Sequence, residues 1–267
     1  LLFYVMELLE GIDLDQIVRQ FGPLNPARVV HLLCQVCSSL AEAHDKGMVH
    51  RDIKPSNVFC CILGDEFDVA KVTDFGLVHV REVQTPAGER SDTVAGTPAY
   101  MSPEHCMGQV DLDGRSDLYA LGCVGYWLLT GRTVFDRTEP KDMMRQHVTA
   151  RPIPPSEAAP LPVPPELDRV ILRCLNKKPD RRFADARELR DALDAVPIPD
   201  DQRWDRERRR AWWAHYGETV RGLQTGEPTT SPTPIRLERG PTQLMSSTDF
   251  ESITLDNGTE FHSYKKL

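Results

Sequence analysis

The sequence predicts an α+β fold that is mainly helical and carries one small β-hairpin. Apolar residues recur at helical spacing between residues 25 and 47, and helical patterns return in several later segments. Two β-like runs, residues 58–63 and 69–72, flank a Gly-Asp-Glu sequence at residues 64–66 that predicts a hairpin loop. With 267 residues and 40% hydrophobic content, the chain is long enough to bury a substantial core.

The N-terminal part is expected to contain a strand, a short helix and a long helix. Residues 1–6 form a continuous apolar run, which favours a strand. A short helix follows near residues 14–20, with Asp13 as its N-cap. Asn25 can cap the long helix, and Pro26 suits its first position. Because the chain opens with Leu inside an apolar run, we expect an N-terminal truncation.

Residues 74–104 show no sustained period and are rich in Thr, Ser, Gly and Pro, so a functional or disordered loop is expected. The proline-rich stretch 152–165 is expected to be an extended connector. Helical patterns resume in four segments, residues 117–130, 141–149, 166–175 and 185–193.

The composition changes after residue 197, so the main domain is assigned to residues 1–196. Residues 197–224 predict a charged helix or linker that carries three tryptophans, Trp204, Trp212 and Trp213. This segment could lie near a membrane or act as a docking helix, or its aromatic side chains could fold onto the preceding domain. Residues 225–267 contain few apolar side chains and predict a disordered tail.

Composition excludes some classes of protein. A net charge of −8 argues against a nucleic-acid surface, which needs clustered positive charge. The seven cysteines lack metal-ligand spacing, and Cys34 and Cys37 are interpreted as core thiols rather than a redox or zinc site. The chain is therefore expected to be reduced and cytoplasmic. No apolar run reaches the roughly 18 residues that a membrane helix needs.

Three motifs occur in order along the chain. Residues 50–57 read His-Arg-Asp-Ile-Lys-Pro-Ser-Asn, residues 74–76 read Asp-Phe-Gly, and residues 102–104 read Ser-Pro-Glu. In their order and spacing they resemble the catalytic loop, D-F-G and A-P-E motifs of the protein kinase family. The run 115–122 and the compact region 152–165 most resemble bacterial Ser/Thr kinases of the eukaryotic-like type.

The resemblance implies a kinase-like fold and transfer of the ATP γ-phosphate to Ser or Thr hydroxyls of proteins. Asp52 would orient or accept the hydroxyl proton, and Lys54 would neutralise the transferring phosphate. Asn57 and Asp74 would hold Mg²⁺ through their oxygens. The alternative roles are an exposed turn residue for Asp52 and a loop cap for Asp74. Lys54, together with Thr97 in Gly-Thr-Pro-Ala-Tyr, points to the Ser/Thr class.

Residues 6–9 (Met-Glu-Leu-Leu) resemble the hinge that joins the two lobes in the protein kinase family. Met6 would be the gatekeeper, and the backbone of Glu7 (its carbonyl) and of Leu9 (its N–H and carbonyl) would meet adenine. Asp13 would reach the ribose or serve only as a helix cap. Phe59 would pack under adenine or belong only to the core.

Regulation by phosphorylation is also implied. Arg51 resembles the arginine that pairs with an activation-loop phosphate, for which Ser91 and Thr93 are the candidate sites and Thr85 is third. The alternative is that these are ordinary loop hydroxyls.

Two structural contacts are implied as well. Asp117 resembles the buried acid that holds the catalytic-loop backbone. Glu104 and Arg182 resemble a buried ion pair, with a surface charge as the alternative for Arg182.

The family's glycine-rich loop, strand lysine and helix glutamate precede the hinge, so the chain is expected to contain the larger C-terminal lobe without the N-lobe. Such a fragment alone is not expected to catalyse efficient transfer, and the parent protein, membrane-anchored or not, would be the kinase. The alternative function is a pseudokinase or lobe-only module that binds partners without catalysis.

Overall fold

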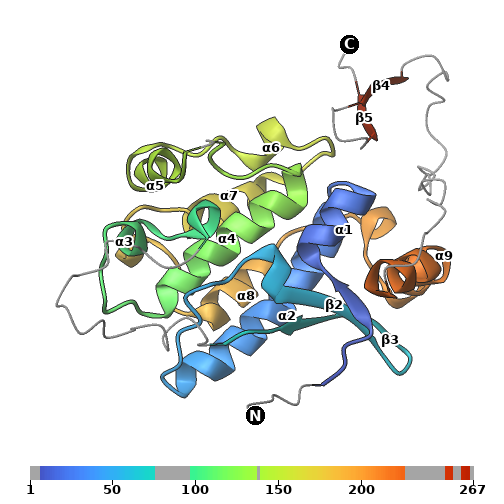
Figure 1. Ribbon diagram of the computed structural model, residues 1–267, viewed down its shortest axis with the longest axis horizontal. Coiled ribbons are helices and arrows are strands. Elements are labelled where there is room, and N and C mark those ends of the chain that lie inside the picture. The colour runs from blue at the N-terminus through green and yellow to red at the C-terminus, as the bar shows by residue number, and fades with distance from the viewer. Residues whose placement is uncertain (1–6, 76–96, 137–138, 226–249, 255–259, 265–267) are drawn as a thin grey trace.

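The computed structural model describes residues 7–75, 97–136, 139–225, 250–254 and 260–264. Figure 1 shows a helical body with a small sheet at one side. The predicted α+β fold, mainly helical with a small sheet, is therefore confirmed.

The sheet contains three antiparallel strands in the order β1-β2-β3. They are β1 (Gly11–Asp13), β2 (Val58–Leu63) and β3 (Glu66–Val72). The predicted hairpin is β2–β3, and β1 adds a third strand, with Asp13 opposite Phe59 and Phe59 opposite Lys71. The short 3₁₀ helix η1 (Pro55–Asn57) leads into β2 and brings the catalytic-loop motif to the end of the sheet.

Helix starts follow the predicted caps. The Asp13 carboxylate accepts a hydrogen bond from the Gln16 N–H at the start of α1 (Leu14–Phe21). The Asn25 side chain accepts one from the Arg28 N–H at the start of α2 (Pro26–Asp45). Each cap satisfies an N–H group that has no partner inside its helix.

Helix α4 (Gly114–Thr130) forms the centre of the helical body and is buried along nearly its whole length. It packs against α2, α7 (Pro165–Cys174) and α8 (Ala186–Asp194), as Figure 1 shows. The fully buried side chains of this core include Leu32, Leu40, Leu118, Tyr119, Leu121 and Phe183. This core holds the catalytic loop and the sheet in fixed positions.

Two segments differ from the sequence prediction. The connector 152–165 contains a short helix, α6 (Pro155–Ala158), because proline is well tolerated at a helix start. The predicted loop 74–104 contains the 3₁₀ helix η3 (Pro98–Tyr100) and α3 (Pro103–Cys106), whose N-cap Ser102 accepts from the His105 N–H. Single-turn helices are too short to give a periodic signal.

The remaining elements are α5 (Pro140–Thr149), the 3₁₀ helices η4 (Pro179–Arg181) and η5 (Asp200–Gln202), and α9 (Arg206–Thr225). Within the tail that is predicted to be disordered, β4 (Phe250–Thr254) and β5 (Glu260–Tyr264) form an antiparallel pair. No helix within the described residues is long and apolar enough to cross a membrane.

Candidate active site

A buried acid fixes the backbone of the catalytic loop. The Asp117 carboxylate accepts hydrogen bonds from the N–H groups of His50 and Arg51, both at 2.8 Å. The ring of His44 lies 2.8 Å from the same carboxylate. Asp117 is buried in the first turn of α4, so the loop is attached to the core helix. The predicted role of Asp117 is therefore confirmed.

Four predicted site residues come together in this loop. The Lys54 ammonium lies 2.7 Å from the Asp52 carboxylate, and it donates at 3.4 Å to the Thr97 hydroxyl. The Asn57 amide N–H donates to the Asp52 carbonyl at 2.9 Å and to its carboxylate at 3.2 Å. The Lys54 ammonium and the Asn57 amide thus both hold the same carboxylate oxygen of Asp52, Oδ2.

Asp74 reaches the same loop through its neighbours in the chain. The N–H of Thr73 donates to the Asn57 carbonyl at 2.9 Å, and the His50 ring lies 2.9 Å from the Thr73 carbonyl. The Phe75 ring packs on the His50 ring, with 4.6 Å between centroids. Asp74 lies between these two contacts, is exposed, and has a φ of 62°. A positive φ is uncommon for a residue with a side chain, and such strain clusters at functional sites.

Asn57 and Asp74 fit the requirements of a magnesium site. The Asn57 amide nitrogen is committed to Asp52, so its oxygen is the atom that can face a cation. Asp74 supplies an exposed carboxylate nearby. In the described part of the chain no group of three or more His, Cys, Asp or Glu side chains could hold a metal. Mg²⁺ does not need such a group, because it commonly binds one or two protein carboxylates together with phosphate oxygens and water.

The described part of the predicted hinge, residues 7–9, and the neighbouring Glu10 are held from several sides. The Lys71 ammonium of β3 lies 2.6 Å from the Glu7 carboxylate. The Ile62 N–H of β2 donates to the Glu10 carbonyl at 2.9 Å. The Leu9 carbonyl accepts at 3.1 Å from the side-chain amide of Gln224.

Other predicted nucleotide contacts have structural surroundings of their own. Asp13 is buried as the cap of α1, and burial raises its pKa above the ordinary value, against the hydrogen bond from the Gln16 N–H. Phe59 is half-buried in the middle strand of the sheet. Met6, Ser91, Thr93 and Thr85 lie outside the described residues, as does Gly76 of the Asp-Phe-Gly motif.

The ion pair between Glu104 and Arg182 is confirmed. Two parallel contacts of 2.7 Å join the guanidinium to the carboxylate, and both residues are buried. Burial opposes the charged carboxylate, but the Arg182 charge and hydrogen bonds from Arg182 and Ser116 hold the Glu104 pKa below its ordinary value. The pair connects the end of the Ser-Pro-Glu motif to the segment before α8.

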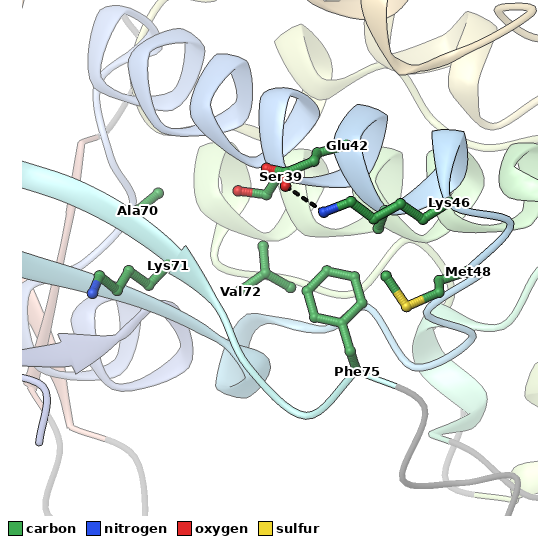
Figure 2. A pocket seen from close by; sticks show the side chains of 9 residues that line it. Ser39, Glu42, Lys46, Met48, Ala70, Lys71, Val72 and Phe75 are labelled. Carbon is green, nitrogen blue, oxygen red and sulfur yellow. Dashed lines mark hydrogen bonds and ion pairs between the residues drawn. The ribbon is translucent and has the colours of Figure 1, made fainter. Parts of the chain in front are cut away.

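A cavity of about 310 Å³ lies beside the Phe75 ring rather than at the Asp52 carboxylate. Figure 2 shows Phe75, Val72 and Met48 around it, between β3 and α2. The Lys46–Glu42 ion pair lies at its α2 side. The phenylalanine of the Asp-Phe-Gly motif therefore contacts His50 on the catalytic loop and also lines open space next to α2.

Sequence reasoning missed two features near this site. His50 links the two motifs, because its ring contacts both the Thr73 carbonyl and the Phe75 ring. The sequence reasoning also missed a buried cluster in which Asp68 accepts hydrogen bonds from Trp204 and Trp213. The tryptophans themselves were a signal, since a buried indole N–H needs an acceptor.

The fold and the catalytic loop together are those of the protein kinase fold. A model of the protein kinase domain matches residues 1–193, and the chain belongs to this family.

Similar proteins include serine/threonine-protein kinases of bacteria. The chain is 41% identical over 212 residues to serine/threonine-protein kinase pkn3 of Myxococcus xanthus. The matched region covers 78% of this chain and 37% of pkn3. The chain is 38% identical over 188 residues to serine/threonine-protein kinase PknB of Mycolicibacterium smegmatis, covering 70% and 29%. The crystal structure of the Mycobacterium tuberculosis PknI kinase domain is similar, with a TM-score of 0.54 and 29% identity over 71% of this chain and 64% of that one. The chain thus spans about a third of the length of these curated relatives.

Proposed function

We propose that this chain is the hinge and larger lobe of a Ser/Thr protein kinase that transfers the γ-phosphate of ATP to Ser or Thr hydroxyls of proteins. The proposal is supported chiefly by the joint placement of Asp52, Lys54 and Asn57 on a loop that Asp117 holds in place. Phosphoryl transfer needs positioning and neutralisation of charge more than covalent help from the protein. The match to 64% of the PknI kinase domain agrees with the assignment to one lobe.

Each side chain then has a role that its contacts allow. Asp52 accepts or orients the proton of the acceptor hydroxyl, and its two neighbours restrict its rotamer. Lys54 brings positive charge to the place where the phosphate moves. Mg²⁺, held by Asn57 and Asp74, would neutralise the charge of the phosphates.

The Ser/Thr acceptor class is supported by the contact of Lys54 with Thr97, which links the catalytic loop to the segment before α3. A hydroxyl acceptor approaching Asp52 would meet this lysine and threonine together. Adenine would meet the Glu7 carbonyl and the N–H and carbonyl of Leu9, with Asp13 near the ribose, Phe59 beneath the ring and Met6 as gatekeeper.

Phosphorylation of Ser91 or Thr93, with Thr85 third, is proposed as the activating step. Arg51, beside Asp52, has a buried Nε atom without a hydrogen-bond partner within the described residues. A phosphate of charge about −2 would satisfy such a group and order the segment that carries it. Mass spectrometry of active protein should find phosphate on at least one of the three, and its absence from all of them would contradict this step.

A cytoplasmic location of this lobe is proposed as well. It is supported by seven free cysteines, all of them buried or half-buried, as in a reduced protein. Protein substrates rather than nucleic acid are proposed as partners, in agreement with the net charge of −8.

The test is transfer of radiolabelled phosphate by the full-length protein and by its Asp52→Asn variant. Loss of the base should reduce kcat by about 10²–10⁴-fold. Asp111→Asn, which changes an exposed aspartate outside the loop, is the matched control and should keep full activity. Equal transfer by the native protein and Asp52→Asn would overturn the role assigned to Asp52, and no transfer by the native protein would favour a binding module.

A further inference from the structure

Helix α9 and the residue stretch before it are fastened to the lobe by one buried carboxylate. Asp68 in β3 is 0% exposed and accepts hydrogen bonds of 2.6 Å from the indole N–H groups of both Trp204 and Trp213. Arg28 of α2 adds two parallel bonds of 2.8 and 2.9 Å. Both tryptophans lie beyond residue 193, where the match to the kinase domain ends.

The aromatic side chains of this segment stack on the same arginine. The Arg28 guanidinium lies 4.0 Å from the Trp212 ring centroid and 4.9 Å from that of Trp204. The Phe21 ring of α1 contacts the Trp212 ring, with 5.2 Å between centroids. Cation–π and aromatic contacts of this kind add to the burial of a hydrophobic face. The segment is therefore packed on the lobe, which is one of the alternatives that its sequence left open.

The ionisation of Asp68 agrees with this arrangement. Burial alone would raise its pKa, but the Arg28 charge and the hydrogen bonds from Arg28, Trp204 and Trp213 more than offset burial and lower it. The carboxylate stays charged, and a charged acceptor makes stronger hydrogen bonds than a neutral one.

The other end of α9 meets the hinge. Helix α9 packs against β1 and β3, and Figure 1 shows it beside the sheet. The Gln224 side-chain N–H donates to the Leu9 carbonyl at 3.1 Å. This bond restrains the ψ angle of Leu9 and the backbone on either side of it. It also occupies one of the two acceptor positions of that carbonyl, so the other position remains for adenine.

We propose that residues 204–224 form a strap that sets the position of the adenine-binding backbone. Trp204 and Trp213 anchor the strap on Asp68, and Gln224 acts as a positioning residue for Leu9. The inference rests on the proposed function to the extent that residues 7–9 bind adenine. It goes further by giving a nucleotide-positioning role to a segment outside the matched kinase domain.

The first experiment compares ATP kinetics of full-length Gln224→Ala, Gln224→Lys and Gln20→Ala. Loss of one hydrogen bond should raise the KM for ATP about two- to ten-fold while kcat stays unchanged. Gln224→Lys keeps an N–H donor and should recover most of the native KM. Gln20→Ala changes an exposed glutamine on α1 and should have no effect. An unchanged KM in Gln224→Ala would overturn the positioning role.

The second experiment needs no activity. In nucleotide-free protein, Trp213→Phe keeps an aromatic ring but loses the N–H donor to Asp68. Amide hydrogen exchange should become faster both in residues 207–224 and in residues 9–13. Faster exchange in α9 alone would refute a strap that bears on the hinge, and Gln224→Ala repeats the measurement if Trp213→Phe does not fold.

The two experiments separate the two proposals. If the native protein transfers no phosphate, the proposed function fails, and hydrogen exchange still decides whether the strap exists. If Asp52→Asn is inactive while Gln224→Ala has a native KM and native exchange in residues 9–13, the strap fails alone.

Discussion

Replacement of Arg182 by alanine should be among the most damaging single changes to this protein. Its guanidinium makes two 2.7 Å contacts with the Glu104 carboxylate. It also donates to the carbonyls of Asn176 at 2.8 Å and Arg115 at 2.9 Å. Arg182→Ala would leave Glu104 buried, with the Ser116 hydroxyl, at 2.7 Å, as the side-chain donor that remains within the described residues.

The expected loss is about 3–5 kcal/mol in the free energy of unfolding, the usual cost of removing one partner of a buried ion pair. The Glu104 pKa is lowered in the folded protein, so the charged pair contributes its full stability above the ordinary pKa of 4.5. That contribution is lost as the pH falls below 4.5. The difference between native protein and Arg182→Ala should therefore shrink in acid. Arg182→Lys keeps the charge but loses the bidentate geometry, and should have an intermediate effect.

Denaturant titration at about pH 7 and about pH 4 measures these differences. Arg187→Ala is the matched control, because Arg187 pairs with Asp45 at the surface, with half of each side chain exposed. An exposed pair is worth at most about 1 kcal/mol. If Arg182→Ala costs less than about 1 kcal/mol at pH 7, the reasoning from burial and bidentate geometry is refuted.

Three further predictions follow from the structure. Asp117→Asn keeps only one acceptor oxygen for the N–H groups of His50 and Arg51. It should lower the free energy of unfolding by about 1–3 kcal/mol and speed amide hydrogen exchange at these two residues. Exchange as slow as in the native protein would contradict the assigned contact. Burial lowers the pKa of Lys177 from 10.5 to about 8. In denaturant titrations, the free energy of unfolding of native protein relative to Lys177→Met should therefore rise between pH 8 and 10.5 and stay constant below that range. Burial also lowers the pKa of His147 from 6.5 to about 3. Native protein should therefore lose stability relative to His147→Gln as the pH falls from 6.5 towards 3. Stability curves that stay parallel over this range would contradict the prediction.

Much of the fold could be predicted because its signals are local. Asp13 and Asn25 cap helices through hydrogen bonds to N–H groups three residues away, and such bonds depend on nearby sequence alone. Helix α2 and the β2–β3 hairpin follow from apolar periodicity and a turn sequence. The one-turn helices α3 and α6 were missed because a single turn has no measurable period.

The candidate site was predictable in its residue types and not in its contacts. The motifs at residues 50–57 and 74–76 indicate which side chains act, and the structure brings Asp52, Lys54, Asn57 and Thr97 within hydrogen-bond distance. The contact between the His50 ring and the Thr73 carbonyl joins residues far apart in sequence, so no local sequence pattern predicts it.

The sequence by itself determined the family, the predicted chemistry and most helix boundaries, because these depend on motifs, caps and periodicity. Only the tertiary structure decided that Asp68 is a buried acceptor rather than an exposed strand residue, since its indole donors are more than a hundred positions away. The same holds for Gln224, whose contact with Leu9 joins residues that are 215 positions apart in the sequence. Burial and long-range hydrogen bonds arise from packing, and packing brings together residues that a linear pattern keeps apart.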